Sequence, residues 1–134
     1  YLDHKLNKFL LTYEEYPGIY LIHQTTNLLM KLNDIEFLID NYKFNVLIDR
    51  NKNNSIEIRV DAEVAYIYSD NYNIFDYKPI LKKYIQEEIT KLYNHCLTLG
   101  VDLFNINYRR YLKKMSHIDL NKLEVIYNIN LITP

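Results

Sequence analysis

The sequence predicts an α+β fold, namely an antiparallel β-sheet with a long helix and shorter helices packed on one face. Two patterns carry this prediction. Apolar and polar residues alternate over Ile56–Tyr68, which is the period of a strand with one buried face. Apolar residues then recur at steps of three and four over Leu81–Leu99, which is the period of an amphipathic helix. A sheet and a helix that each have one apolar side bury those sides against each other.

The N-terminal part of the chain gives less regular patterns. Apolar residues at helical spacing over Lys5–Tyr16 predict a short helix. The Pro17-Gly18 pair that follows breaks regular structure, and we expect a short strand over Gly18–Gln24. The apolar segment Leu28–Ile39 predicts a further strand over part of its length.

A β-hairpin is predicted in the middle of the chain. Its first strand contains Phe44, Val46 and Ile48 at alternate positions. The polar run at 51–54 suits a tight turn, because asparagine tolerates left-handed backbone conformations. In the second strand we expect one set of side chains to share the buried face: Ile56, Ile58, Val60, Ala62, Val64, Tyr66 and Tyr68. A charged set is expected on the opposite, solvated face: Glu57, Arg59, Asp61 and Glu63.

The second half of the chain predicts the long helix. After a loop over Ser69–Tyr77, Asp76 suits a helix cap and Pro79 suits a first turn. The helix has about six turns, and one apolar stripe runs along it: Leu81, Ile85, Ile89, Leu92, Cys96 and Leu99. Gly100 stands where a left-handed C-terminal cap belongs.

Two shorter helices and a last strand complete the expected domain. The helices are predicted over Leu103–Met115 and Ile118–Leu123. The last strand is predicted from four alternating apolar residues: Val125, Tyr127, Ile129 and Leu131. All these elements fit a single domain over residues 1–134.

Composition places the chain among ordinary globular domains. Hydrophobic residues make up 49% and charged residues 25%, which argues against disorder, and the net charge of −1 gives no reason to expect nucleic acid. The single Cys96 excludes an internal disulfide, and no run of about 18 apolar residues could span a bilayer. The 14 tyrosines are explained either by codon bias or by a partly hydrated surface that contacts a partner. Because the chain opens at Tyr1 without an initiator Met, we expect it to be a fragment of a longer protein.

Several stretches resemble the Ger(x)C family, the C-subunits of nutrient germinant receptors in spore-forming bacteria. Tyr1–Lys5 and Phe9–Leu11 resemble a family segment that reads GyLdekE…gll.l. Leu99–Phe104, followed by Tyr108–Arg110, resembles the family pattern gaDifgfg…lrr, with Asp102 at its acidic position. The order of hairpin, long strand and long helix also resembles that of the family.

The chain departs from the family pattern at three places. Leu6 stands roughly where the family carries a glutamate, and Asn105 and Asn107 stand near its glycines. The segment Met115–Asp119 is shorter than the tryptophan-bearing stretch of the family, and the chain has no Trp. This last departure leaves the packing before the final strand open.

The resemblance implies a C-terminal domain of a non-catalytic subunit, without a cofactor, that supports receptor assembly and signalling in spore germination. Family members are lipoproteins at the spore inner membrane, anchored by an N-terminal cysteine that would lie upstream of this fragment. They assemble with two integral-membrane subunits, which are the partners that the resemblance implies here.

The sequence carries no recognisable catalytic or metal-binding motif. The histidines are scattered and lack the spacing of a two-ligand metal motif: His4, His23, His95 and His117. Cys96 falls within the apolar stripe and is expected to be a buried small hydrophobe. Two glycines cannot form a phosphate-binding loop, and no serine lies in a nucleophile elbow.

Two other functions are kept open. A small hydrolase domain that uses paired carboxylates is the alternative, since such a pair leaves no sequence signature. Glu57, Asp61 and Glu63 are also explained by charge pairing on a solvated strand face. A domain that binds a germinant directly is the third hypothesis, and the sequence locates no pocket for it.

Four basic residues form the candidate interaction patch: Arg109, Arg110, Lys113 and Lys114. On a helix, Arg109 and Lys113 are neighbours, as are Arg110 and Lys114. A solvated helix face explains the cluster. Contact with anionic lipid head groups or an acidic partner also explains it, and each basic residue near an anionic membrane contributes about 1 kcal/mol.

Overall fold

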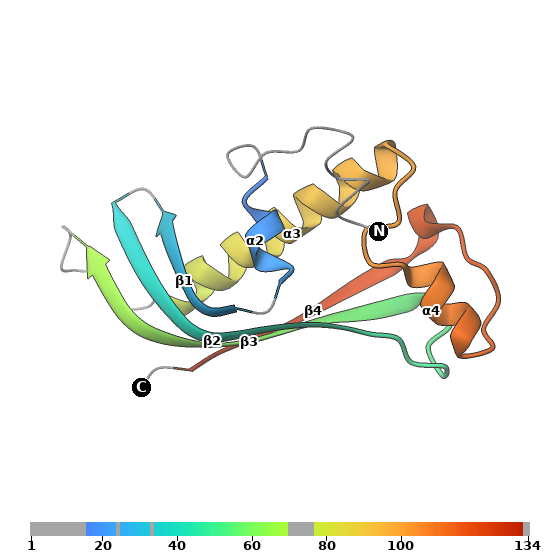
Figure 1. The fold of residues 1–134 in the computed structure, drawn as a ribbon, viewed down its shortest axis with the longest axis horizontal. Coiled ribbons are helices and arrows are strands. Elements are labelled where there is room, and N and C mark those ends of the chain that lie inside the picture. Colours follow the sequence, from blue (N-terminus) through green and yellow to red (C-terminus); the bar gives the residue numbers. More distant parts are fainter. Residues whose placement is uncertain (1–15, 24, 33, 70–76, 133–134) are drawn as a thin grey trace.

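The computed structural model describes residues 16–23, 25–32, 34–69 and 77–132. Its elements within these residues are, in chain order, α2 (Gly18–Leu21), β1 (Thr25–Leu32), β2 (Ile35–Leu47), β3 (Ser55–Ser69), α3 (Lys78–Thr98), α4 (Ile106–Leu112), the 3-10 turn η1 (Leu120–Lys122) and β4 (Glu124–Ile132). The strands form one sheet in the order β1-β2-β3-β4, and α2 and α3 lie over one face of it (Figure 1). The predicted α+β fold, with a long helix on one face of a sheet, is confirmed.

The sheet is mixed rather than fully antiparallel. β1 and β2 pair antiparallel, as do β2 and β3, so the predicted hairpin is confirmed. β4 runs parallel to β3, with Ile58 opposite Tyr127, and this corrects the expected antiparallel sheet for its last pair. The reason lies in the connection. The chain crosses the sheet through α3 and returns to the start of β3, where the Glu124 amide donates to Asn54 O at 2.8 Å, and a parallel pair requires such a crossover.

A β-bulge reverses the orientation of side chains at the end of β3. Adjacent residues of β2 pair with Val64 and Tyr66, which makes Ala65 an extra residue. Ile67 therefore packs against the core, whereas Tyr66 and Tyr68 are 59% and 49% exposed. The predicted inward orientation of these two tyrosines is wrong, because one extra residue moves all later side chains of a strand to the opposite face.

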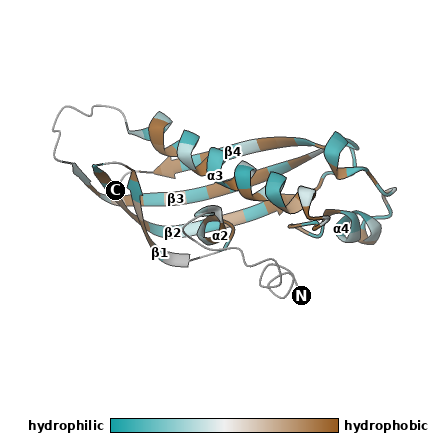
Figure 2. Ribbon diagram, turned by 90° about the horizontal axis from the view of Figure 1, so that it is seen from above, coloured by the Kyte–Doolittle hydropathy of each residue, from teal (hydrophilic) through white to brown (hydrophobic). Residues whose placement is uncertain are grey.

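The core lies between the inner face of the sheet and the helices. The alternation predicted for β3 is confirmed up to the bulge by five buried side chains: Ile56, Ile58, Val60, Ala62 and Val64. The stripe of α3 is confirmed by five fully buried side chains, and Leu99 packs partly buried beside them: Leu81, Ile85, Ile89, Leu92 and Cys96. Figure 2 shows α3 running along the length of the sheet with α2 beside it. The two apolar sides cover each other, as the sequence predicts.

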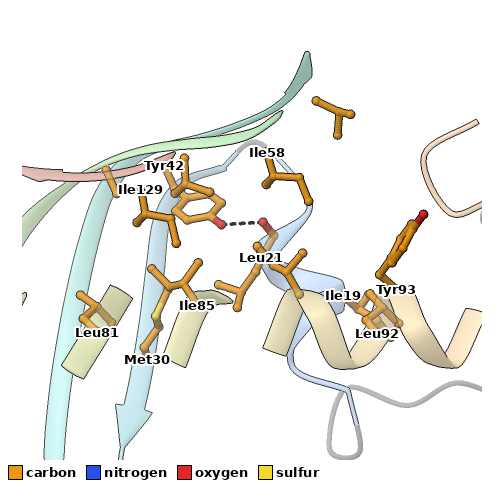
Figure 3. Packing of buried hydrophobic residues seen from close by; sticks show 14 of the residues in the cluster. Ile19, Leu21, Met30, Tyr42, Ile58, Leu81, Ile85, Leu92, Tyr93 and Ile129 are labelled. Carbon is orange, nitrogen blue, oxygen red and sulfur yellow. Dashed lines mark hydrogen bonds between the residues drawn. The ribbon is translucent and has the colours of Figure 1, made fainter. Parts of the chain in front are cut away.

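The segment after Pro17 is a short helix, so the strand predicted over Gly18–Gln24 is wrong. Tertiary packing decides its conformation. Gly18 lies so close to α3 that a Cβ atom there would come within 2.5 Å of the Glu88 carbonyl oxygen. The buried Tyr42 hydroxyl donates to Leu21 O at 2.5 Å, which ties α2 to the sheet (Figure 3). The strand expected within Leu28–Ile39 corresponds to the end of β1 and the start of β2.

The two ends of α3 test the helix start and the C-terminal cap that the sequence predicts. Pro79 lies in the first turn, as expected. At the other end Gly100 has φ +72°, its amide donates to Leu97 O at 3.1 Å, and the Val101 amide donates to Cys96 O at 2.8 Å. This hydrogen-bond pair is a Schellman motif, so the predicted C-terminal cap is confirmed. The Asp76 cap and the helix predicted over Lys5–Tyr16 lie outside the described residues, apart from Tyr16 itself.

The helices after α3 are shorter than predicted. α4 ends at Leu112 instead of Met115, because the chain makes a second Schellman motif there. Lys114 has φ +58° and donates to Tyr111 O at 3.0 Å, and the Met115 amide donates to Arg110 O at 2.9 Å. The helix expected over Ile118–Leu123 is reduced to η1. β4 occurs where the last strand is predicted.

Candidate functional site

Asp102 and the four residues of the candidate interaction patch lie within or close to α4, which is at one end of the molecule beside the turn between β2 and β3 (Figure 1). Arg110 is 1% exposed. Its Nη1 donates to Asn53 O at 2.7 Å, its Nη2 donates to Asn53 Oδ1 at 2.9 Å, and its Nε donates to Ser116 O at 2.9 Å. Arg110 therefore fastens α4 to the hairpin turn.

The four residues of the candidate interaction patch do not share one exposed surface. Arg109 is partly buried, and its Nη2 donates to Val46 O at 2.5 Å. Lys113 and Lys114 are exposed, and both lie beyond the end of α4, so the helical pairing expected for them does not form. The two arginines attach α4 to the sheet, and the two lysines are left as the exposed charges of the cluster.

Asp102 stands at the start of α4, where it organises the chain. Its Oδ2 accepts a hydrogen bond from the Asn107 amide at 3.1 Å, which satisfies a backbone donor of the first helical turn. The Asn107 side chain bridges to Ile118, donating to its carbonyl and accepting from its amide, both at 2.9 Å. Asn107, which stands near glycines of the family pattern, thus bridges two segments of the chain. The sequence gives no signal for this bridge beyond the departure itself.

Two adjoining cavities form a groove beside these residues. One has a volume of about 560 Å³ and the other about 390 Å³, and both are lined by Leu97, Leu120 and Asn121. We call this pair of cavities the α3–η1 groove. Asp102, Asn107, His117 and Asp119 line the larger cavity, and Thr90, Tyr93, Asn94 and Tyr127 are among the residues that line the smaller one. The groove is the hollow that lies nearest to the family-like acidic position.

Tyr93 is the most buried polar side chain of the groove. It is 4% exposed, and its ring stacks on Phe104 with the centroids 5.6 Å apart. Its hydroxyl has no hydrogen-bond partner among the described residues. Burial, followed by the negative charges of Asp102 and ionised Tyr127, raises the pKa of Tyr93 to about 12. The sequence does not single out this residue, because Tyr93 is not part of the apolar stripe predicted for the helix.

Tyr127 and Thr90 complete the wall of the smaller cavity. Their hydroxyl oxygens are 2.5 Å apart in a hydrogen bond that joins β4 to α3. Burial raises the pKa of Tyr127, and the hydrogen bond from Thr90 partly offsets this shift. The Tyr127 hydroxyl is therefore engaged within the protein, in contrast to that of Tyr93.

The carboxylates that the hydrolase alternative requires have polar partners on the open face of the sheet. Glu57 lies 2.8 Å from the Arg59 guanidinium. Asp61 Oδ1 accepts from Asn130 Nδ2 at 3.0 Å, and Glu63 Oε2 accepts from the Asn41 side chain at 3.3 Å. The ion pair runs along β3 itself, whereas the two amide contacts come from neighbouring strands. These partners agree with the charge-pairing explanation of the strand.

Potential metal ligands do not gather among the described residues, where no three of His, Cys, Asp and Glu form a cluster. Cys96 is fully buried in the stripe of α3, as predicted, and burial raises the pKa of its thiol to about 11. His95 stacks on Tyr16, with ring centroids 4.6 Å apart. His4 lies outside the described residues. Within the part of the chain that the structure describes, no helix is long and apolar enough to cross a membrane.

Comparison with known proteins supports the fold. No protein-family model matches the chain, and no curated protein matches it by sequence. A solved structure, that of the GerBC protein, matches with a TM-score of 0.58 at 13% sequence identity. The match covers 92% of this chain and 46% of the GerBC chain, so this chain spans about half the length of that protein. Over nearly its whole length, the chain therefore has a Ger(x)C-like fold.

Proposed function

We propose that this chain is the C-terminal domain of a non-catalytic germinant-receptor C-subunit that supports receptor assembly and signalling in spore germination. The observation that carries this proposal is the structural likeness to the GerBC protein over 92% of the chain. The sequence resemblance around Asp102 points to the same family. This resemblance concerns the identities of residues rather than the arrangement of strands, so it supports the proposal independently.

The described surface suits a binding domain better than a hydrolase. The carboxylates of β3 hold an ion pair or amide partners, and Asp102 uses one oxygen to begin α4. A hydrolase of the glycosidase type needs two carboxyl groups that flank the bond to be cleaved. The engaged carboxylates of β3 are poor candidates for that role.

The open face of the sheet offers a surface for partner subunits. Leu29 pairs with Leu38, and Leu38 pairs with Tyr66, so these three side chains form a row across three strands. Their exposed fractions are 67%, 37% and 59%. Single exposed apolar residues are common, but a contiguous row on a strand face is typical of an interaction surface. We assign this row to contact with the integral-membrane subunits of the receptor.

The exposed lysines beyond α4 are assigned to the membrane surface. A lipid anchor at an upstream cysteine would hold the domain beside the spore inner membrane, where Lys113 and Lys114 could meet anionic head groups. Each basic residue contributes about 1 kcal/mol in such a contact. Binding to anionic vesicles that falls in a double alanine variant of the two lysines supports this part of the proposal, and equal binding contradicts it.

Co-purification with the membrane subunits tests the assignment directly. The full-length protein should retain its membrane subunits, and a variant with both Leu29→Ser and Tyr66→Ser should lose most of them. Tyr111→Ser is the matched control, because Tyr111 is 74% exposed and lies on α4 rather than on the open face. Equal recovery of the membrane subunits by all three proteins would contradict the role of the row. Failure of the unaltered protein to co-purify would contradict the receptor function.

A further inference from the structure

The α3–η1 groove contains two buried polar atoms that the described part of the protein leaves without a hydrogen bond. One is the Tyr93 hydroxyl, at the end of a side chain that is 4% exposed. The other is Asp102 Oδ1, whose companion oxygen already accepts from the Asn107 amide. A buried polar atom without a partner costs about 1–3 kcal/mol. Two such atoms beside adjoining cavities therefore destabilise the folded protein unless a ligand forms hydrogen bonds with them.

Tyr93 lines the smaller cavity of the groove, and its ring is held there by stacking on Phe104. The ring is held flat against Phe104, with an interplanar angle of 9°, and Phe104 also contacts Phe44 of the sheet, with centroids 5.6 Å apart. Figure 3 shows the hydroxyl of Tyr93 at the end of the ring that lies away from α3. This row of stacked rings limits the positions that the Tyr93 ring, and its hydroxyl with it, can take.

The charge of the groove is negative. Asp102 and Asp119 line the larger cavity, and no lysine or arginine is among the described residues that line either cavity. Two hydrogen bonds from Asn121, through its amide and its side chain, lower the pKa of Asp119, with smaller contributions from Lys122 and His117. Asp119 therefore remains ionised at the exposed rim. A cationic ligand complements this lining, and an anionic one would be repelled.

We propose that the α3–η1 groove binds a small aliphatic amine, whose ammonium group donates to Asp102 Oδ1 and to the Tyr93 hydroxyl oxygen. An ammonium has three donors, so it can donate to more than one acceptor. Leu97 and Leu120 supply apolar walls for a short methylene chain, and Asp119 receives a second ammonium where the ligand carries one. This binding site is distinct from the open-face row and does not depend on the proposed receptor function.

The test uses the 134-residue chain, with putrescine as the probe and 1,4-butanediol as its neutral counterpart of the same length. Calorimetry and two-dimensional NMR should show saturable putrescine binding, with shifts at Leu97, Asp102 and Leu120, and no binding of the diol. Tyr93→Phe and Asp102→Asn should each weaken putrescine binding at least tenfold. Asparagine keeps an acceptor for the Asn107 amide, so the start of α4 is retained in that variant. Tyr111→Phe, a change at a surface tyrosine outside the groove, should leave binding unchanged.

Three outcomes would overturn the inference. They are the absence of saturable putrescine binding, equal binding of the diol, and undiminished binding by Tyr93→Phe, whose ring still fits the same space. The far-ultraviolet circular dichroism spectrum of each variant shows that the fold is intact. Because this experiment needs no partner subunit, its result is separate from the co-purification that tests the receptor function.

Discussion

Arg110 holds both oxygens of Asn53, one through each terminal nitrogen of its guanidinium, at 2.7 and 2.9 Å. The two residues are 57 positions apart in the sequence, and their contact joins α4 to the turn between β2 and β3. A planar guanidinium presents parallel donors that match such a pair of oxygens, which a lysine ammonium cannot reproduce. An arginine that the sequence groups with an exposed basic cluster is thus the attachment point of a helix.

Arg110→Ala should lower the free energy of unfolding by about 3 kcal/mol, because it removes three charge-assisted hydrogen bonds and a buried side chain. Arg110→Lys should recover part of this loss but not the paired contact with Asn53. Urea denaturation followed by circular dichroism gives both values. Lys113→Ala is the control and should change the free energy of unfolding by less than about 0.5 kcal/mol, because Lys113 is exposed. Equal effects at the two positions would contradict the anchoring role.

Lys114→Gly should stabilise the protein by about 0.5–1 kcal/mol. Lys114 adopts φ +58° at the end of α4, a conformation that costs energy for any residue with a Cβ atom and little for glycine. The same motif at the end of α3 has Gly100, with φ +72°. Gly100→Ala should therefore destabilise by about 1 kcal/mol. No atom lies within 4 Å of the added Cβ, so this cost is conformational rather than steric. Opposite shifts of the thermal unfolding midpoint in the two variants are the expected result.

The sequence predicted those elements whose pattern is long and uninterrupted. The alternation of β3 and the stripe of α3 each extend over many residues, so the hydrophobic effect selects one orientation for them. Prediction from the sequence failed where a single residue changes the orientation of the side chains that follow it. The bulge at Ala65 reverses Tyr66 and Tyr68, and no local preference reveals it. The parallel pairing of β4 follows from the path of the crossover, and a strand pattern carries no information about its direction.

The candidate site was less predictable, because its contacts join segments that are distant in sequence. Clustering of Arg109, Arg110, Lys113 and Lys114 is visible in the sequence, but their separation into anchored arginines and exposed lysines depends on the hairpin turn that α4 meets. Asp102 can be identified in the sequence because it stands at the acidic position of the family pattern. Its hydrogen bond with the Asn107 amide appears only in the structure. The unpartnered hydroxyl of Tyr93 has no sequence signature at all.

Tyr42→Phe and Tyr93→Phe should have opposite effects on stability, although each removes one buried hydroxyl. The Tyr42 hydroxyl donates to Leu21 O, so its removal leaves a carbonyl without a partner and should cost about 1–2 kcal/mol. The Tyr93 hydroxyl has no partner among the described residues, so its removal should be neutral or stabilising by up to about 1 kcal/mol. Urea denaturation without added amine compares the two variants. A loss of stability in Tyr93→Phe as large as that in Tyr42→Phe would contradict the assignment of a free hydroxyl.

Alkaline pH should unfold the protein in a defined window. Burial raises the pKa of Tyr93 from 10.0 to about 12, raises that of the Cys96 thiol from 9.0 to about 11, and raises that of Tyr42 further still. Between its unfolded and folded pKa values, each group is protonated in the folded protein and ionised in the unfolded chain. The unfolded state then binds fewer protons, so the free energy of unfolding decreases as the pH rises.

Stability should therefore be constant up to about pH 9 and decline from there through about pH 12. Tyrosinate absorbance should show two classes of tyrosine. Tyr42 and Tyr93, which belong to the buried class, should ionise together with the loss of the circular dichroism signal. In Tyr93→Phe the free energy of unfolding should decline less steeply above pH 10, because one of the groups whose pKa differs between the folded and unfolded states has been removed. A single titration of all tyrosines in a protein that stays folded would contradict the burial of these two hydroxyls.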